Sequence, residues 1–140
     1  TITDCEIVAV PKNELVEAAA KSPQVLRDIL KLTMNEYTSL LLRITALEQS
    51  SAAEKIALTL YYLLYRHGEE TSPGVYAIHI KMTQSMIASL VGLTRESTAV
   101  NLKLLKKKGI VTYGNFTYNV NKSNLELFVG EDFFKNALDA

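Results

Sequence analysis

The sequence predicts a mainly α-helical chain of the α+β class, with a long helix, a pair of shorter helices and a small antiparallel β-sheet. Apolar residues recur every three or four positions after Ser22-Pro23, and a glycine-containing break at 91–93 separates two shorter runs of the same spacing. Two β-rich runs then flank Gly114-Asn115. In order, these observations predict a long helix, a helix-turn-helix and a β-hairpin, which together make a winged helix-turn-helix.

Composition is typical of a globular protein from a reducing compartment. A length of 140 residues with 48% hydrophobic content suits one domain with an appendage. The one cysteine, Cys5, allows no intrachain disulfide, and the sequence shows neither a signal-peptide pattern nor an apolar run of bilayer length. We therefore expect a cytoplasmic protein that does not bind membranes.

Chemistry-bearing residues do not form a recognisable catalytic or metal site. The two histidines, His67 and His79, do not stand at metal-ligand spacing from cysteine or carboxylates. We also find no nucleophile–base pair, no paired carboxylates suited to a cleft and no phosphate-binding loop. We expect that the protein is not an enzyme and holds no metal.

The N-terminal segment is interpreted as the edge of another domain. Residues 2–10 are β-rich and end at Pro11, so we expect the last strand of a sheet whose other strands lie upstream in a longer protein. A short helix is predicted at 12–20, with Asn13 as a candidate cap.

A long helix is predicted from residue 22 to about residue 50. Ser22 is a suitable cap and Pro23 a suitable first residue, because proline has no N–H to leave unpaired there. Apolar residues alternate in steps of three and four, with Thr33 filling the one longer gap, and this spacing keeps one seam facing a partner helix. We favour a homodimer seam over a core helix packed within its own chain. The seam residues are Leu26, Leu30, Tyr37, Leu40, Ile44 and Leu47.

A second helix, a loop and a strand follow. Ser51 and Glu54 have the spacing of a capping box, and helical apolar spacing continues to about Arg66, where Gly68 ends the helix. The polar run at 69–74 is rich in turn residues and is predicted to be a loop. Beyond it, apolar residues alternate as in a strand: Tyr76, Ile78 and Ile80.

The run MTQSMIASLVGLTRESTAVNLKLLKKKGI predicts the helix-turn-helix. Gly92 supplies the positive φ that a tight turn needs, because it has no Cβ to clash. Thr94 is a suitable cap for the second helix, Leu102 and Leu105 give that helix a buried edge, and Gly109 stops it.

The segment from Lys81 to Lys122 is strongly basic within a neutral chain. It holds seven cationic residues and one anionic residue, a net charge of +6, whereas the whole chain has 15 residues of each sign. Duplex DNA carries about one phosphate charge per 1.7 Å of axis, so this surface predicts DNA binding. For the lysines at 106–108 alone, the alternative is a solvated helix end, where cations also favour the helix dipole.

The C-terminal part predicts a wing and a tail. The β-rich runs at 110–113 and 116–120 flank Gly114-Asn115 and predict a hairpin whose tip could touch phosphate or the minor groove. Residues 123–128 and 131–138 are predicted as short amphipathic helices, and we expect the tail to dock on the body of the domain.

This order of elements resembles the C-terminal half of the cyclic-AMP-receptor/fumarate-nitrate-regulator (Crp/Fnr) superfamily of bacterial transcription factors. The run KMTQSMIASLVGLTRESTAVNLKLLKKKGIV is similar to the family's pattern of Thr-Gln, Ile-Ala, Gly-Leu-Thr-Arg-Glu and Gly-Ile. CEIVAVPKNEL looks like the end of its effector-binding β-roll, and SPQVLRDIL like the start of its dimer helix. The resemblance implies a β-roll remnant at 1–21, a dimerisation helix at 22–50 and a winged helix-turn-helix DNA-binding domain at 51–140.

The resemblance also implies residue roles. Arg95 matches the family's major-groove arginine and Glu96 its partner carboxylate, while Ser97 matches a phosphate-contacting hydroxyl and Lys103 a backbone contact. Arg donates to guanine O6 and N7 and Glu accepts from cytosine N4, although Glu96 also suits a first-turn acid favoured by the helix dipole. The expected DNA-contacting residues are Thr83, Gln84, Thr94, Arg95, Glu96, Ser97, Val100, Asn101 and Lys103.

Several positions depart from the family pattern. Val100 stands where many members have a further base-reading arginine, so the operator should differ from the best-known half-site. Thr98 and Asn101 replace commonly apolar residues, and Asn101 could join the DNA face. Leu40-Leu41 stand in place of the family's Thr-Ser pair, with Thr38-Ser39 close but offset. A cyclic nucleotide is allowed by the resemblance but unsupported by this chain, so the effector is unknown.

We interpret the chain as part of a homodimeric, sequence-specific DNA-binding transcription regulator that an effector controls through an upstream domain. Its expected partners are a double-stranded DNA operator, a second copy and, by resemblance, RNA polymerase at the loop 69–74. The alternative is a winged-helix module that docks on protein and has lost DNA binding, which Val100 and Asn101 make conceivable.

Overall fold

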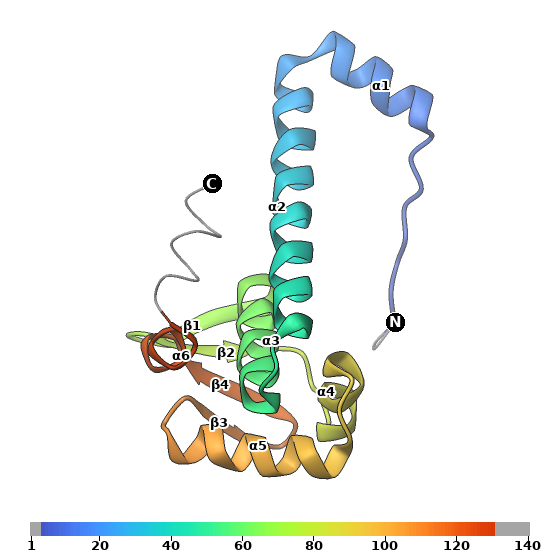
Figure 1. Ribbon diagram of the computed structural model, residues 1–140. Coiled ribbons are helices and arrows are strands. Elements are labelled where there is room, and N and C mark those ends of the chain that lie inside the picture. Colours follow the sequence, from blue (N-terminus) through green and yellow to red (C-terminus); the bar gives the residue numbers. More distant parts are fainter. Residues whose placement is uncertain (1–3, 131–140) are drawn as a thin grey trace. The chain divides into compact units, whose positions relative to one another are not determined.

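The computed structural model describes residues 4–130 of the chain (Figure 1). These residues fall into two compact units with the boundary between Glu36 and Tyr37. The mainly helical fold with a small antiparallel sheet agrees with the sequence prediction. In chain order the elements are α1 (Lys12–Lys21), α2 (Pro23–Glu48), α3 (Ala52–His67), β1 (Gly68–Ser72), β2 (Val75–Ile78), α4 (Gln84–Val91), α5 (Arg95–Lys107), β3 (Val111–Gly114), β4 (Thr117–Asn121) and α6 (Lys122–Val129).

The first unit contains α1 and the beginning of α2. Helix α1 confirms the predicted short helix, but Asn13 lies inside it: the N-cap is Pro11, and no side chain caps the helix. The strand expected at 2–10 is wrong for residues 4–10, which have no regular secondary structure. A strand requires a hydrogen-bonded neighbour, and no described strand pairs with these residues.

Helix α2 begins where the sequence predicts. The Ser22 hydroxyl accepts a hydrogen bond from the Val25 N–H at 3.4 Å, so Ser22 acts as the cap ahead of Pro23. In the part of α2 that belongs to the second unit, one narrow face is buried. It consists of Ser39, Leu42 and Ala46.

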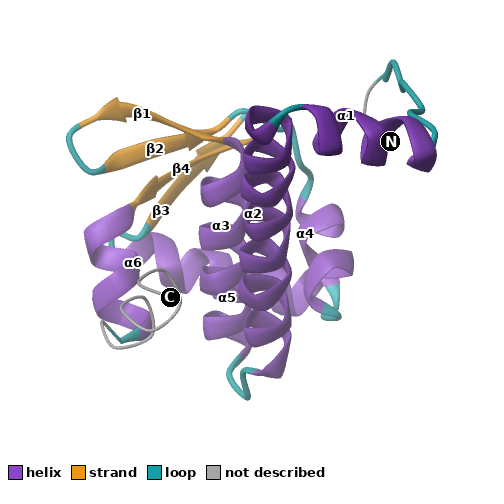
Figure 2. Cartoon of the chain, turned by 90° about the horizontal axis from the view of Figure 1, so that it is seen from above, coloured by secondary structure: helices purple, strands orange, loops and turns teal. Residues whose placement is uncertain are grey.

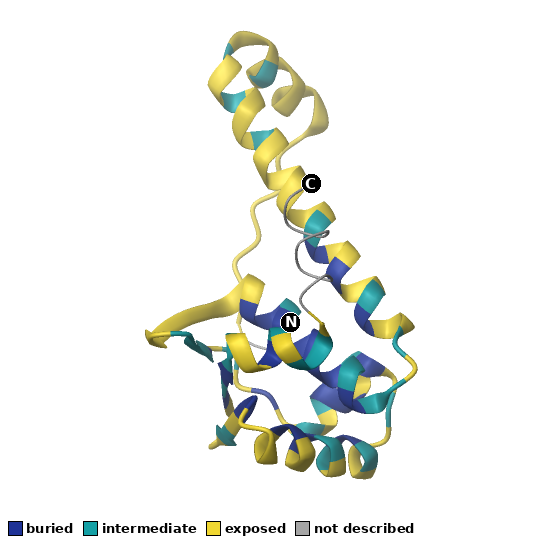
Figure 3. Ribbon diagram, turned by 60° about the vertical axis from the view of Figure 1, so that its left-hand side comes forward, coloured by how far each residue is buried: buried dark blue, intermediate teal, exposed yellow. Residues whose placement is uncertain are grey.

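Helix α3 is the centre of the core of the second unit. Ser51 accepts a hydrogen bond from the Glu54 N–H at 3.5 Å, and Gly68 ends the helix, as predicted. Nine of the 16 residues of α3 are buried, and Figure 3 shows much of the buried surface on this helix. It packs against α4, α5, α6, β1 and β2. A helix that neighbours cover on several sides must be apolar around most of its circumference.

The four strands form one antiparallel sheet in the order β1-β2-β4-β3 (Figure 2). The loop predicted at 69–74 is therefore wrong in its first part, which belongs to β1. All five residues of β1 are exposed, so the strand has no apolar alternation, and its backbone pairing with β2 defines it. The strand predicted next is confirmed as β2, although Ile80 lies beyond its end.

The predicted hairpin is confirmed, with its turn displaced by one residue. Strands β3 and β4 pair as far as Gly114 and Thr117, so Asn115 and Phe116 form the turn. Their φ angles are +50° and +64°. Two positive φ angles give a turn whose twist matches that of the flanking strands, and asparagine tolerates this conformation far better than phenylalanine does.

Helix α6 confirms the helix predicted at 123–128. The Asn121 side-chain oxygen accepts a hydrogen bond from the Asn124 N–H at 3.0 Å and caps the helix. Leu125 is fully buried in the cluster around α3. The second helix and the docking predicted for the tail lie outside the described residues. Between residues 4 and 130, no helix combines the length and apolar character needed to cross a bilayer.

Candidate nucleic-acid interface

Two capped helices and a left-handed glycine form the helix-turn-helix. The hydroxyl of Thr83 accepts a hydrogen bond from the Met86 N–H at 3.2 Å and caps α4. Helix α4 ends at Gly92, whose φ of +68° confirms the predicted requirement for a residue without Cβ. Thr94 then caps α5 by accepting from the Ser97 N–H at 3.1 Å. Together these caps fix the direction in which α5 leaves the turn.

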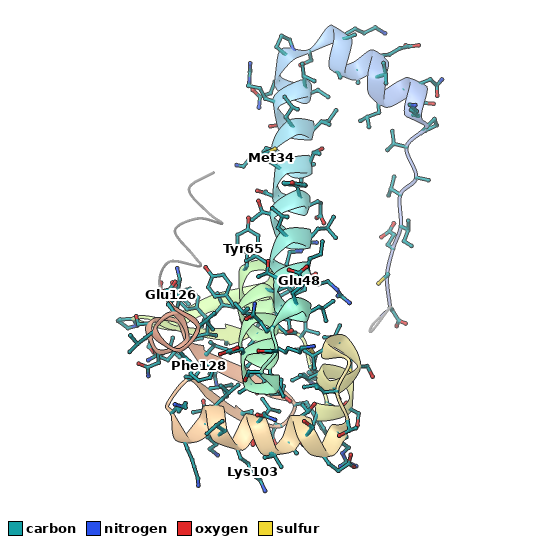
Figure 4. All side chains as sticks on the ribbon, in the orientation of Figure 1. Met34, Glu48, Tyr65, Lys103, Glu126 and Phe128 are labelled. Carbon is teal, nitrogen blue, oxygen red and sulfur yellow. The ribbon has the colours of Figure 1, made fainter. Side chains whose placement is uncertain are left out.

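Helix α5 has a buried side and an exposed side. Thr98, Leu102 and Leu105 are fully buried, and α5 packs on α3 and α4. Burial of each leucine stabilises the packing by about 1.5–3 kcal/mol. Figure 3 shows exposed residues along the outward side of α5, and in Figure 4 Lys103 points away from the rest of the domain. The domain thus holds α5 by one side and leaves the other accessible to a partner.

All nine predicted DNA-contacting residues lie on α5 or at the caps and starts of α4 and α5. Asn101 Nδ2 donates to the Ser97 carbonyl oxygen at 2.9 Å, so part of its hydrogen-bonding capacity is used within the helix, as the capping bonds use part of that of Thr83 and Thr94. Val100 is 66% exposed and is the apolar residue among the nine, and Leu104, one turn further along α5, is 41% exposed. Thr83, Thr94, Arg95, Glu96, Val100 and Lys103 are exposed, whereas Gln84, Ser97 and Asn101 are half-buried.

Some charged side chains of α5 and its C-cap contact aromatic rings of the protein, and others form no contact with an opposite charge among the described residues. Lys106 lies over the Tyr113 ring at 5.4 Å and Lys108 over the Phe128 ring at 5.2 Å, distances from Nζ to the ring centroid. Cation–π contacts of this kind are worth about 0.5–1 kcal/mol at exposed sites. Within residues 4–130, neither Arg95 nor Glu96 forms an ion pair. The first turn of α5 therefore offers one cation and one anion that packing does not engage.

A cleft of about 580 Å³ lies between the hairpin, the start of α4 and Arg95. The Met82 N–H donates to the Phe116 carbonyl oxygen at 2.9 Å and ties the hairpin tip to the segment before α4. Burial raises the pKa of Tyr118, and the neighbouring Tyr113 raises it further, so the phenol stays neutral. The cleft lining includes residues that sequence reasoning did not select, because only the general position of the hairpin could be predicted: Asn115, Phe116 and Thr117.

Helix α2 presents a second surface with exposed apolar residues. In the part of α2 that belongs to the second unit, the predicted seam lies opposite the buried face, given 3.6 residues per turn. Its exposed fractions are 57% for Tyr37, 57% for Leu40, 52% for Ile44 and 40% for Leu47. In the first unit, Leu26 and Leu30 are likewise exposed. Within residues 4–130, no three His, Cys, Asp or Glu side chains gather into a possible metal site.

Capped helices around a tight turn, followed by an antiparallel hairpin, define a winged helix-turn-helix, an architecture in which the second helix of the pair enters the DNA major groove. Residues 54–122 match the sequence model of the Crp-like helix-turn-helix domain. The chain belongs to the Crp/Fnr superfamily of DNA-binding transcription regulators, as its sequence predicted.

Relatives agree with this assignment, and solved structures agree with the fold. A probable transcriptional activator of Rhizobium leguminosarum bv. viciae is 27% identical over 116 residues, which cover 83% of this chain and 48% of the relative. The regulatory protein HlyX of Actinobacillus pleuropneumoniae is 32% identical over 120 residues, 84% of this chain and 48% of HlyX. Both are described as regulators, not as enzymes.

The solved structure of FixK2 from Bradyrhizobium japonicum has the same fold, with a TM-score of 0.64 and 24% identity over 86% of this chain and 60% of FixK2. The structure of CprK (C200S) complexed with OCPA gives a TM-score of 0.57 with 16% identity, over 84% of this chain and 54% of that one. The chain spans about half the length of the curated relatives it matches.

Proposed function

We propose that this chain is the DNA-reading and dimerisation part of a homodimeric, sequence-specific transcription regulator. The observation that carries the proposal is the division of α5 into two sides. Leu102 and Leu105 anchor one side in the core, while the other presents Arg95, Glu96 and Lys103 to solvent. The major groove admits one α-helix, and a helix held in this way can enter it without disturbing the core.

Each exposed residue type has a matching partner in the duplex. Arg95 donates its guanidinium fork to guanine O6 and N7, Glu96 accepts from a cytosine amino group, and Val100 meets a thymine methyl. Ser97 and Lys103 contact phosphates, which position the helix without reading sequence. The remaining contacts come from Thr83, Gln84, Thr94 and Asn101.

The exposed apolar side of α2 supports the homodimer. Two copies that pair along this seam remove its leucines, isoleucine and tyrosine from water, and each square ångström of apolar surface buried is worth about 25 cal/mol. In such a pair, two α5 helices read half-sites about 34–36 Å apart, one turn of DNA. The seam residues remain those chosen from the sequence: Leu26, Leu30, Tyr37, Leu40, Ile44 and Leu47.

Effector control through an upstream domain completes the proposal. Two observations support it. The curated relatives are about twice as long as the part of them that this chain matches, and a long helix precedes the helix-turn-helix domain. An effector would shift the population of α2–α3 orientations at the joint 49–52. In a bacterial cytoplasm, RNA polymerase would then contact the exposed segment 69–74, and replacing that segment in a reporter assay tests this contact.

A second function, docking on another protein, is favoured by the exposed side chain of Val100. The two functions differ in their response to salt. Binding to DNA releases counterions and weakens steeply as salt rises, whereas binding in an apolar protein groove changes little. Titration of the purified chain at two salt concentrations therefore separates them.

Selection from a pool of randomised duplexes tests the DNA-reading role. We expect the parent to return a defined motif and Arg95→Ala to lose the preference at one base pair, at a cost of about 1–3 kcal/mol. The matched control Lys103→Ala should weaken binding to all duplexes alike and reduce the salt slope by about one. A parent that binds no duplex at low salt contradicts the proposed function, and an unchanged motif with Arg95→Ala contradicts the role of that residue.

A further inference from the structure

The hairpin tip carries a residue that folding does not explain. Phe116 is 61% exposed and has a φ of +64°. In hairpins with two turn residues at positive φ, the favoured pair is asparagine followed by glycine. A bulky side chain at the second position strains the backbone, and an exposed ring gains little from burial. Neither turn geometry nor core packing therefore accounts for phenylalanine at this position.

The tip is fixed to the helix-turn-helix. The backbone hydrogen bond from Met82 to Phe116, 2.9 Å long, joins the hairpin tip to the segment that leads into α4. Phe116 lines the same cleft as Thr83 and Arg95. A side chain exposed at this tip is thus held beside the first turns of both helices of the motif.

The lining of the cleft combines three kinds of chemistry. Arg95 is the charged residue of the lining, and Phe116 and Tyr113 supply aromatic surface. The neutral donors and acceptors are the hydroxyls and amides of Thr83, Gln84, Ser85, Asn115 and Thr117. A phosphodiester strand matches this set, because its phosphate accepts from hydroxyls, amides and guanidinium, and its deoxyribose offers an apolar face. An acidic peptide fits less well, because its carboxylate side chains offer no apolar face to the exposed ring of Phe116.

We propose that this cleft seats the sugar–phosphate backbone of one DNA strand and that Phe116 packs on a deoxyribose beside the half-site. The inference rests on the proposed function and adds a contact that is independent of base sequence. The wing then acts as a clamp that holds α5 in register along the groove. The strain at Phe116 is retained because the ring is needed for the clamp.

Phe116→Gly separates this role from folding, because glycine relieves the left-handed strain while it removes the ring. We expect roughly fivefold to tenfold weaker binding to the selected operator and, by the same factor, to a random duplex. The thermal midpoint should stay equal or rise. The matched control is Leu127→Ala on α6, which removes another exposed apolar side chain, 74% exposed, and should leave both affinities unchanged.

Hydroxyl-radical footprinting, which reports on deoxyribose, supplies the second readout. The parent should protect sugars beside the half-site that Phe116→Gly leaves accessible to the radical. Protection of guanine N7 within the half-site, measured separately by methylation with dimethyl sulfate, should persist in the variant. Equal binding by variant and parent overturns the inference and leaves the proposed function standing. Weaker binding of Phe116→Gly to the operator alone also overturns the inference, and so does a loss of guanine N7 protection in this variant. In either case Phe116 acts through base reading. A parent that binds no duplex overturns the proposed function and the inference with it.

Discussion

The Ser39 hydroxyl in α2 accepts a hydrogen bond from Nη1 of Arg66, near the end of α3, at 3.3 Å. Ser39 is 3% exposed and shares its face of α2 with Leu42 and Ala46, which belong to the same apolar cluster as α3. The family's Thr-Ser pair would stand next to this position, at Leu40-Leu41. In this chain the hydroxyl of Ser39 accepts from Arg66, so it joins α2 to α3 of the winged helix-turn-helix domain.

Ser39→Ala should lower the free energy of unfolding by about 1 kcal/mol. A hydrogen bond to a charged donor is worth about 1.5–3 kcal/mol when both groups are buried, but Arg66 is exposed and can be hydrated again. Urea denaturation at one protein concentration measures the change. Thr45→Ala is the matched control, since the Thr45 hydroxyl donates only within α2, to the Leu41 carbonyl oxygen. Equal losses in the two variants would show that the contact with α3 contributes nothing.

Thr98→Val should stabilise the domain by about 1 kcal/mol. The Thr98 side chain is fully buried in α5, and its hydroxyl has no hydrogen-bond partner among the described residues. A buried hydroxyl without a partner costs about 1–3 kcal/mol, and valine has nearly the same shape. The thermal midpoint should rise while duplex affinity stays constant, because this side chain faces the core. A fall in the midpoint would mean that the hydroxyl is satisfied, for example by a buried water.

The helices and their ends could be predicted because local chemistry determines them. Thr94 and Ser51 cap helices in the structure as predicted, and Gly92 has the left-handed φ that the turn requires, whereas the cap at Thr83 was not predicted. Strand β1 was missed because its side chains are all exposed and polar, so pairing with β2 is the only feature that makes it a strand. Patterns of apolar residues cannot reveal an element whose side chains bury nothing.

The candidate site was predictable in its helical part and unpredictable in its wing. The exposed residues of α5 follow from helical periodicity once Leu102 and Leu105 are placed in the core. The cleft depends on a backbone contact between Met82 and Phe116, which are far apart in sequence. The turn itself was misplaced by one residue, because phenylalanine is a poor choice for a positive φ. Sequence reasoning is expected to fail where a residue type conflicts with its backbone conformation, and such conflicts are found mostly at functional or strained positions.

Ile44→Glu should convert the proposed homodimer into a monomer. Ile44 is 52% exposed on the apolar side of α2, and a carboxylate placed opposite its own copy would be buried without a partner charge. Sedimentation equilibrium measures the change. Arg43→Glu introduces the same carboxylate at the neighbouring exposed position, which is already polar, and should leave the dimer intact. A parent that sediments as a monomer at every concentration would contradict the seam, and so would an unchanged mass with Ile44→Glu.

Val100→Arg should add a guanine preference at one base pair of each half-site. The side chain of Val100 is 66% exposed on the outward side of α5, so an arginine can stand there without repacking the core. Arginine donates two hydrogen bonds to guanine O6 and N7, which valine cannot do, and such a pair discriminates by about 1–3 kcal/mol. Selection from randomised duplexes, run beside the parent, measures the new preference.

Val100→Lys separates charge from geometry at the same position. Lysine adds an equal charge without the planar fork, so it should raise affinity for all duplexes and steepen the salt dependence while changing the motif much less. If the arginine variant returned the parent's motif, the position would lie too far from the base edges, and Val100 would have to meet a partner other than a thymine methyl. Because both variants carry the same charge, a difference between their motifs can come only from contact with the bases, which places this turn of α5 inside the groove.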